Sequence, residues 1–102
     1  FRSAVEIFCR SVAKGVAAMA VSLGGVDTLV FAGGIGENAS PIRARVGELL
    51  CFLGLVLDPQ ANDRHAPLIS SPASRVRVRV IPTDEDWIIA RHTRRLALGA
   101  AP

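Results

Sequence analysis

The sequence has few of the side chains that recognise nucleic acids. It contains no tyrosine, four phenylalanines and one tryptophan among 102 residues, so flat rings on which bases could stack are scarce. The formal net charge is only +3, from 12 basic and 9 acidic residues. A basic excess of this size is typical of a solvated surface, even with arginines gathered at 75–79 and 91–95. We therefore expect no nucleic-acid partner.

Metal-binding cysteines, catalytic histidines and long apolar runs are also missing. Cys9 and Cys51 have no CxxC spacing and no histidine cluster nearby. We therefore expect two reduced core residues and no metal bound by either cysteine. His65 and His92 stand alone, without the context of a catalytic triad, and are predicted to lie at the surface. No apolar run approaches the roughly 18 residues of a membrane helix, and no signal-peptide pattern occurs. These absences favour a cytoplasmic protein without membrane contacts.

Half of the residues are apolar, which is enough for the core of one domain. The chain begins at Phe1 without an initiator methionine and opens directly on helical periodicity. Both features suggest that residues 1–102 form one piece of a larger protein.

The apolar spacing predicts alternating helices and strands. Steps of three and four residues predict a helix from Val5 to Leu23, ended by two glycines. The apolar run at 28–31 predicts a strand buried on both faces. Ser40 followed by Pro41 predicts a helix that begins near Pro41 and is closed by a glycine at 54.

The second half of the chain is predicted to hold two strands and a last helix. Residues 55–58 fit a short strand, and 59–74 a loop anchored at Leu68 and Ile69. Strict alternation predicts a strand over 75–82, with its valines on one face and its arginines on the other. Thr83 with an acid three residues later predicts a helix from about 84 to 98. This order indicates α/β or α+β architecture, with helices covering a sheet.

The segment GGIGEN, residues 33–38, lies between a predicted buried strand and a predicted helix. Its glycines could simply turn the chain and permit tight packing. They could equally bring the backbone close to a nucleotide, because a Cβ atom would block that approach. Two nucleotide-binding alternatives remain open.

One alternative is a Rossmann-type module that binds NAD(P). Gly34, Gly36 and Ala39 satisfy G-x-G-x-x-A, and Asp58 follows at about the offset of a ribose-binding acid. Two features oppose it: the helix is predicted to begin after the motif, and Glu37 would place a carboxylate where the pyrophosphate should lie.

The other alternative is an ATP-binding turn whose glycines face adenosine and ribose. Glu37 and Asn38 then become polar groups beside the nucleotide. No Walker A motif occurs in the chain, so the phosphates would be held by residues outside it.

Three acids follow the alternating strand, in PTDEDW at 82–87. Acids at a helix N-terminus stabilise the helix by roughly 0.3–1 kcal/mol each, which is a sufficient structural explanation. Alternatively, one carboxylate faces a cleft at the end of the strand and holds Mg²⁺ for phosphoryl transfer. Two strand ends, one rich in glycine and one acidic, would then share a crevice.

Two long segments resemble the C-terminal end of the acetate kinase family, which comprises acetate and propionate kinases. They are LVFAGGIGENASPIRARV at 29–46 and VIPTDEDWIIARHT at 80–93, joined by FLGLVLD. The similarity runs from about Val5 to Leu96. It implies an α/β fold with a mixed sheet and flanking helices, part of the C-terminal lobe of an actin-like (ASKHA, RNase H-like) ATPase fold.

The resemblance also implies a reaction and a site. Enzymes of this family reversibly transfer the γ-phosphoryl group of ATP to acetate or a similar short carboxylate, and they bind ATP between two lobes. The acid that matches Glu85 binds Mg²⁺. The residues that match the nucleotide-contacting stretch are Gly34, Ile35, Gly36, Glu37 and Asn38.

The resemblance further implies what this segment lacks. The family usually shows Asn or Asp, Glu, Glu in the acidic turn, whereas this chain has Asp84, Glu85 and Asp86. The acyl pocket, the catalytic Asp, Arg and His, and the phosphate loops belong to earlier parts of the family's chains. We therefore expect no catalytic residue here, no activity from this segment alone, and two partners: the missing N-terminal part and a second copy in a homodimer.

Overall fold

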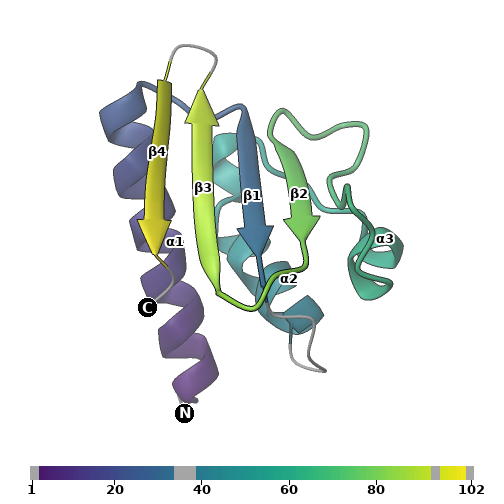
Figure 1. The fold of residues 1–102 in the computed structure, drawn as a ribbon. Coiled ribbons are helices and arrows are strands. Elements are labelled where there is room, and N and C mark those ends of the chain that lie inside the picture. The colour runs from purple at the N-terminus through teal and green to yellow at the C-terminus, as the bar shows by residue number, and fades with distance from the viewer. Residues whose placement is uncertain (1–2, 34–38, 93–94, 101–102) are drawn as a thin grey trace.

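A computed structural model of the chain describes residues 3–33, 39–92 and 95–100, and shows helices packed on one face of a four-stranded sheet (Figure 1). The sheet order is β2-β1-β3-β4; β1 and β2 are parallel, and the other pairs are antiparallel. The α/β prediction with a mixed sheet is therefore confirmed. The elements are α1 (Ala4–Leu23), β1 (Thr28–Ala32), α2 (Ala39–Leu49), the 3-10 helix η1 (Cys51–Leu53), α3 (Pro59–Asp63), β2 (Arg77–Ile81), β3 (Trp87–His92) and β4 (Arg95–Ala100).

Helix α1 is the long N-terminal helix that the periodicity predicts. Ser3 caps it by accepting a hydrogen bond from the amide of Glu6 (3.1 Å), which satisfies one of the free N–H groups of the first turn. Gly24, in a left-handed conformation with φ 80°, ends the helix, and Gly25 N donates to Ala20 O (2.9 Å). Within the described ranges, no helix is both long and apolar enough to cross a bilayer.

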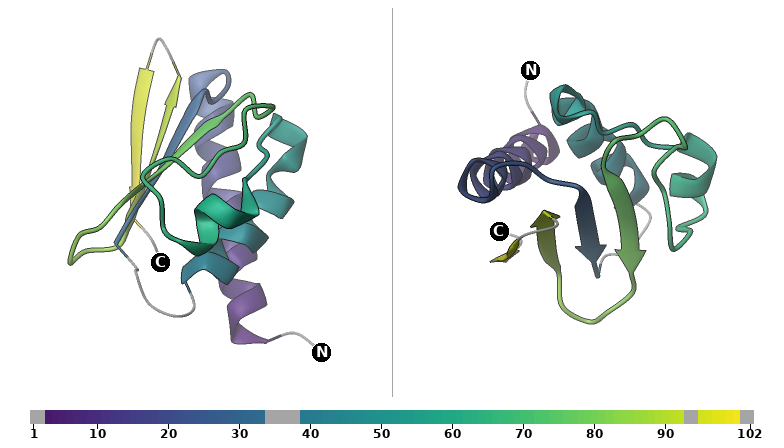
Figure 2. Two further views of the ribbon diagram at one scale, coloured as in Figure 1. Left: turned by 90° about the vertical axis from the view of Figure 1, so that its right-hand side faces the viewer. Right: turned by 90° about the horizontal axis from the view of Figure 1, so that it is seen from above.

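Both long helices lie on the same side of the sheet (Figure 2). Leu29 of β1 faces them and is fully buried beside Val78 and Ala90 of the neighbouring strands. Val30 points the other way and is only half-buried, between Arg79 and Ile89. Thr28 and Ala32, which alternate onto the same face as Val30, are nevertheless buried. The expected burial of β1 on both faces is therefore confirmed at the ends of the strand and wrong at Val30, and no helix of the described part of the chain covers this face (Figure 2). The predicted alternation in β2 is confirmed: its valines are buried and its arginines exposed.

The predicted C-terminal helix over 84–98 is wrong, because β3 and β4 occupy this segment. Ile88 and Ala90 pair with Phe31 and Leu29 of β1, and burial alternates along β3 with the two-residue period of a strand. Thr83 does not cap a helix, since its Oγ1 donates to the backbone oxygen of Glu85 (2.5 Å) and closes a turn. Pairing with β1 therefore overrides the local helix signals.

The middle of the chain departs from the prediction in smaller ways. Helix α2 begins at Ala39 rather than near Pro41. The predicted strand at 55–58 is reduced to a single bridge between Leu57 and Ser70. Within the predicted loop, Ile69 is a fully buried anchor but Leu68 is exposed. Cys9 is buried as expected, whereas the prediction of a buried thiol at position 51 is wrong.

An ion pair ties α1 to α2. Arg45 Nε and Nη2 donate to the two carboxylate oxygens of Glu6 (2.8 and 2.9 Å), and Arg10 Nε donates to the same group (2.8 Å). These hydrogen bonds, chiefly those from Arg45, lower the pKa of Glu6 from 4.5 to about 2. A carboxylate with a lowered folded-state pKa stabilises the fold above its unfolded pKa, and this stabilisation is lost as pH falls toward the folded pKa.

Glu6→Gln is therefore expected to reduce the loss of stability between about pH 4.5 and pH 2, because the variant has no proton to take up at this position. Urea unfolding of both proteins across this range measures the effect. The matched control is Glu48→Gln, because Glu48 is the more exposed partner of Arg45 at a longer distance (3.3 Å). An unchanged acid slope in the Glu6 variant would contradict the prediction.

Candidate functional site

The two motifs that the sequence singles out meet at one edge of the sheet. Strands β1 and β2 run parallel, so Ala32 and Ile81 end side by side in the register. Gly33, directly after β1, donates its amide hydrogen to the backbone oxygen of Ile81 (2.9 Å). The chain then passes from Ile81 through the acidic turn into β3. The expected convergence of a glycine-rich and an acidic strand end is confirmed at Gly33.

Gly33 lies directly against the acidic turn. Its φ is 90°, and a Cβ atom there would lie 2.8 Å from the backbone oxygen of Glu85 and 3.0 Å from Asp86 Cα, and would overlap the Asp86 carboxylate. Such distances are far below van der Waals contact. Only glycine therefore lets the end of β1 approach the acidic turn this closely.

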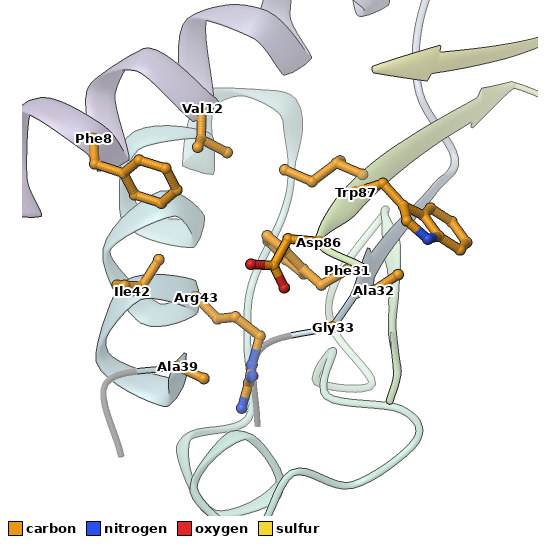
Figure 3. Close-up of a pocket in the computed structure, with 11 residues that line it drawn as sticks. Phe8, Val12, Phe31, Ala32, Gly33, Ala39, Ile42, Arg43, Asp86 and Trp87 are labelled. Carbon is orange, nitrogen blue, oxygen red and sulfur yellow. The ribbon is translucent and has the colours of Figure 1, made fainter. Parts of the chain in front are cut away.

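A small cavity of about 170 Å³ lies between α1, α2 and this edge of the sheet (Figure 3). Its wall is mainly apolar, with Phe8, Phe31 and Ile42 among the lining residues, and it has two charged groups, Arg43 and Asp86. Figure 3 shows the indole of Trp87 on the side of β3 away from Phe8 and Ile42. Sites for drug-sized ligands occupy roughly 300–1,000 Å³, so this cavity has room for only part of a nucleotide.

The acidic turn lies at the surface, although the Asp86 side chain also lines the cavity. Asp84, Glu85 and Asp86 are all exposed. Within the described ranges, no cation pairs with Glu85, and no three acidic, histidine or cysteine side chains converge as a metal cluster. Mg²⁺ is commonly held by one or two carboxylates together with water and substrate phosphates. A single free carboxylate at Glu85 fits that mode of binding, whereas an all-protein metal cage does not.

The five predicted nucleotide contacts, Gly34, Ile35, Gly36, Glu37 and Asn38, lie outside the described residues, so their role stays a prediction. Gly33 and Ala39 flank them, and both line the cavity.

The structure gives the Rossmann alternative no support at Asp58. The Asp58 carboxylate caps α3, where its Oδ1 accepts from the amides of Gln60 (3.0 Å) and Ala61 (3.3 Å). The objection that the helix begins after the glycine motif does not hold, because α2 starts at Ala39. The argument against NAD(P) binding is therefore the Asp58 carboxylate, which is already engaged in capping α3.

Arg43 is a feature of the site that the sequence interpretation missed. It is 3% exposed, and burial lowers the pKa of its guanidinium. Its Nε donates to Asn62 Oδ1 (2.8 Å), and its Nη2 donates to Asn62 O (3.0 Å) and lies 2.7 Å from His65 Nδ1. Since a guanidinium only donates, Nδ1 is the acceptor and the ring proton lies on Nε2. His65 is thus engaged with a buried arginine, contrary to the prediction of an isolated surface residue.

Comparison with known proteins identifies the family of the chain. The model of the acetokinase family matches residues 1–91. An acetate kinase of Rhodopseudomonas palustris (strain TIE-1) is 53% identical over 98 residues, which cover 94% of this chain and 25% of that protein. An acetate kinase of Rhizobium meliloti is 57% identical over 84 residues, covering 82% of this chain and 21% of that protein.

Solved structures resemble the same region. A propionate kinase from Francisella tularensis subsp. tularensis SCHU S4 matches with a TM-score of 0.68 at 41% identity, covering 78% of this chain and 21% of its own. An acetate kinase from Entamoeba histolytica matches with a TM-score of 0.69 at 29% identity, covering 79% and 22%.

The fold and these neighbours define part of a lobe of the actin-like fold. The chain belongs to the acetokinase family. It spans about a quarter of the length of the curated relatives that it matches.

Proposed function

We propose that this chain is the nucleotide-facing part of an acetate kinase-type phosphotransferase, which transfers the γ-phosphoryl group of ATP reversibly to acetate or a similar short carboxylate. The observation that carries the proposal is the contact between the two motifs. Gly33 holds the start of the glycine turn against the backbone of Glu85, so a nucleotide lying on the turn would have its phosphates near a free carboxylate.

In this proposal, Gly34, Ile35, Gly36, Glu37 and Asn38 contact the adenosine, and Glu85 is a ligand of Mg²⁺. The bound Mg²⁺ would neutralise charge on the phosphate oxygens during transfer. Glu85 would hold the ion at the strand edge, and the apolar cavity wall beneath Gly33 would support the turn. Phosphoryl transfer relies on positioning and charge stabilisation. In this proposal, the groups that position and stabilise the transferred phosphoryl group belong to the rest of the enzyme.

Several parts of the proposal concern the complete protein. The segment alone is expected to be inactive, and its partners are ATP or ADP, acetate, the N-terminal part of the same enzyme and a second copy in a homodimer. The open sheet face, with Val30 and Ile89 only half-buried, is one surface on which such a partner would pack. We place the enzyme in the cytoplasm. NAD(P) binding is not proposed, because Asp58 is engaged in capping.

A chimeric kinase tests the proposal. It is the full-length acetate kinase of Rhodopseudomonas palustris (strain TIE-1) with the matching segment replaced by this chain, which is 53% identical to it over 98 residues. Acetyl phosphate formation from Mg·ATP and acetate is expected within about tenfold of the parent rate, a difference of about 1.4 kcal/mol in the barrier. The isolated chain, assayed in parallel, should form none. A chimera with the parent's melting temperature but no acetyl phosphate formation would overturn the proposal.

A further inference from the structure

One buried side chain outside the predicted site connects α3 to the beginning of α2. Asn62 is 2% exposed. Its Nδ2 donates to the backbone oxygen of Ser40 (2.8 Å), and its Oδ1 accepts from Arg43 Nε (2.8 Å). The single side-chain amide of Asn62 therefore binds both the backbone of the first turn of α2 and the Arg43 side chain at the start of the second turn.

The position of this link along the chain gives it significance. Ser40 follows Ala39, the first residue of α2 and the first described residue after the glycine-rich segment at 34–38. Gly33 precedes that segment and is fixed by its hydrogen bond to Ile81 (2.9 Å) and by its contact with the acidic turn. One end is thus held by the sheet, and the other is held by Asn62 and Arg43.

The hydrogen bonds that link Asn62 to Ser40 and Arg43 are better suited to fixing the position of α2 than to stabilising the fold. A buried guanidinium is costly unless its donors are satisfied, and apolar residues of similar volume often stabilise a protein as well or better. Hydrogen bonds, however, fix direction as well as distance. Arg43 also lines the cavity, and Figure 3 shows its side chain extending toward the end of the cavity that Ala39 and Gly33 line.

We propose that Asn62 and Arg43 are positioning residues that fix the first turn of α2, and with it the approach of residues 34–38 to ATP. This inference rests on the proposed function. Helix α3 thereby controls nucleotide affinity without touching the nucleotide. Loss of the link shifts the start of α2, so ATP binding weakens while the acetate-binding part of the enzyme is unaffected.

The test is made in the chimeric kinase with Asn62→Leu, which removes all side-chain hydrogen bonds at similar volume, and Asn62→Asp, which keeps an acceptor for Arg43 but loses the donor to Ser40. Both variants are expected to raise the KM for ATP about tenfold, a loss of about 1.4 kcal/mol in binding, while kcat and the KM for acetate stay within about twofold. The control is Val46→Ala, a fully buried change on α2, which lowers the melting temperature without raising the KM for ATP.

Amide hydrogen exchange in the same proteins gives a readout that does not depend on turnover. Asn62→Leu is expected to speed exchange at Arg43 and Ala44 in α2 and to leave α1 unchanged, because opening of the first turn is local. Unchanged exchange there, or an unchanged KM for ATP in an active chimera, overturns the inference. An unsubstituted chimera that keeps the parent's melting temperature but forms no acetyl phosphate overturns the proposed function instead, and with it the ATP consequence of the link.

Discussion

Gly33→Ala is expected to lower the free energy of unfolding by about 3 kcal/mol. Two costs add at this position. A residue with a Cβ atom loses roughly 1–2 kcal/mol in a left-handed backbone conformation, and Gly33 has φ 90°. The new methyl group would also lie 2.8 Å from Glu85 O and 3.0 Å from Asp86 Cα, and such overpacking typically costs a further 1–3 kcal/mol.

The neighbouring atoms cannot move away cheaply. Glu85 O accepts the hydrogen bond that closes the acidic turn (2.5 Å), and Gly33 N is bonded to Ile81 O (2.9 Å). Urea unfolding measures the loss. The matched control is Gly24→Ala, because Gly24 has a similar φ of 80° but nothing within 4 Å of the added Cβ. That variant should lose only the backbone cost of about 1–2 kcal/mol, and equal losses in the two variants would contradict the close approach at Gly33.

The parts of this fold that could be predicted from the sequence are those fixed by local pattern. The apolar stripe and the paired glycines define α1, and alternation defines β2. The parallel pairing of β1 with β2 accounts for the convergence of the two motifs. Parallel strands end at the same edge of a sheet, so the segments that follow them lie close together. The predicted convergence of the two strand ends is confirmed because it depends on strand ends rather than on side-chain contacts.

The parts that could not be predicted depend on contacts between distant residues. Trp87, Ile88 and Ile89 are compatible with a helix or a strand, and pairing with a strand more than 50 residues earlier in the chain decides between them. Likewise, nothing near Arg43 in the sequence marks it as buried, because its acceptor Asn62 lies 19 positions away. The short α3 did have a signal, Asp58 before Pro59, of the same kind as Ser40 before Pro41.

Glu85→Gln in the chimeric kinase is expected to have the largest effect on activity. In the proposed function Glu85 is a direct protein ligand of Mg²⁺, and loss of residues that merely support a metal ligand already costs about 10–100-fold. We therefore expect kcat/KM for Mg·ATP to fall by about 100-fold or more, and the Mg²⁺ concentration for half-maximal rate to rise. Initial rates measured over a Mg²⁺ titration at fixed ATP report both changes.

Controls can separate this effect from damage to the turn. Glu85 is exposed, and the turn is closed through its backbone oxygen rather than its carboxylate, so Glu85→Gln should change stability by no more than about 0.5 kcal/mol. Asp84→Asn removes a neighbouring exposed charge and should leave the Mg²⁺ titration nearly unchanged. Asp86→Asn alters a carboxylate that lines the cavity beside Gly33, so its effect should be on stability and ATP affinity. If the Mg²⁺ titration of each of the three variants matches that of the unsubstituted chimera, no carboxylate of this turn holds the metal, and the turn serves only to support Gly33.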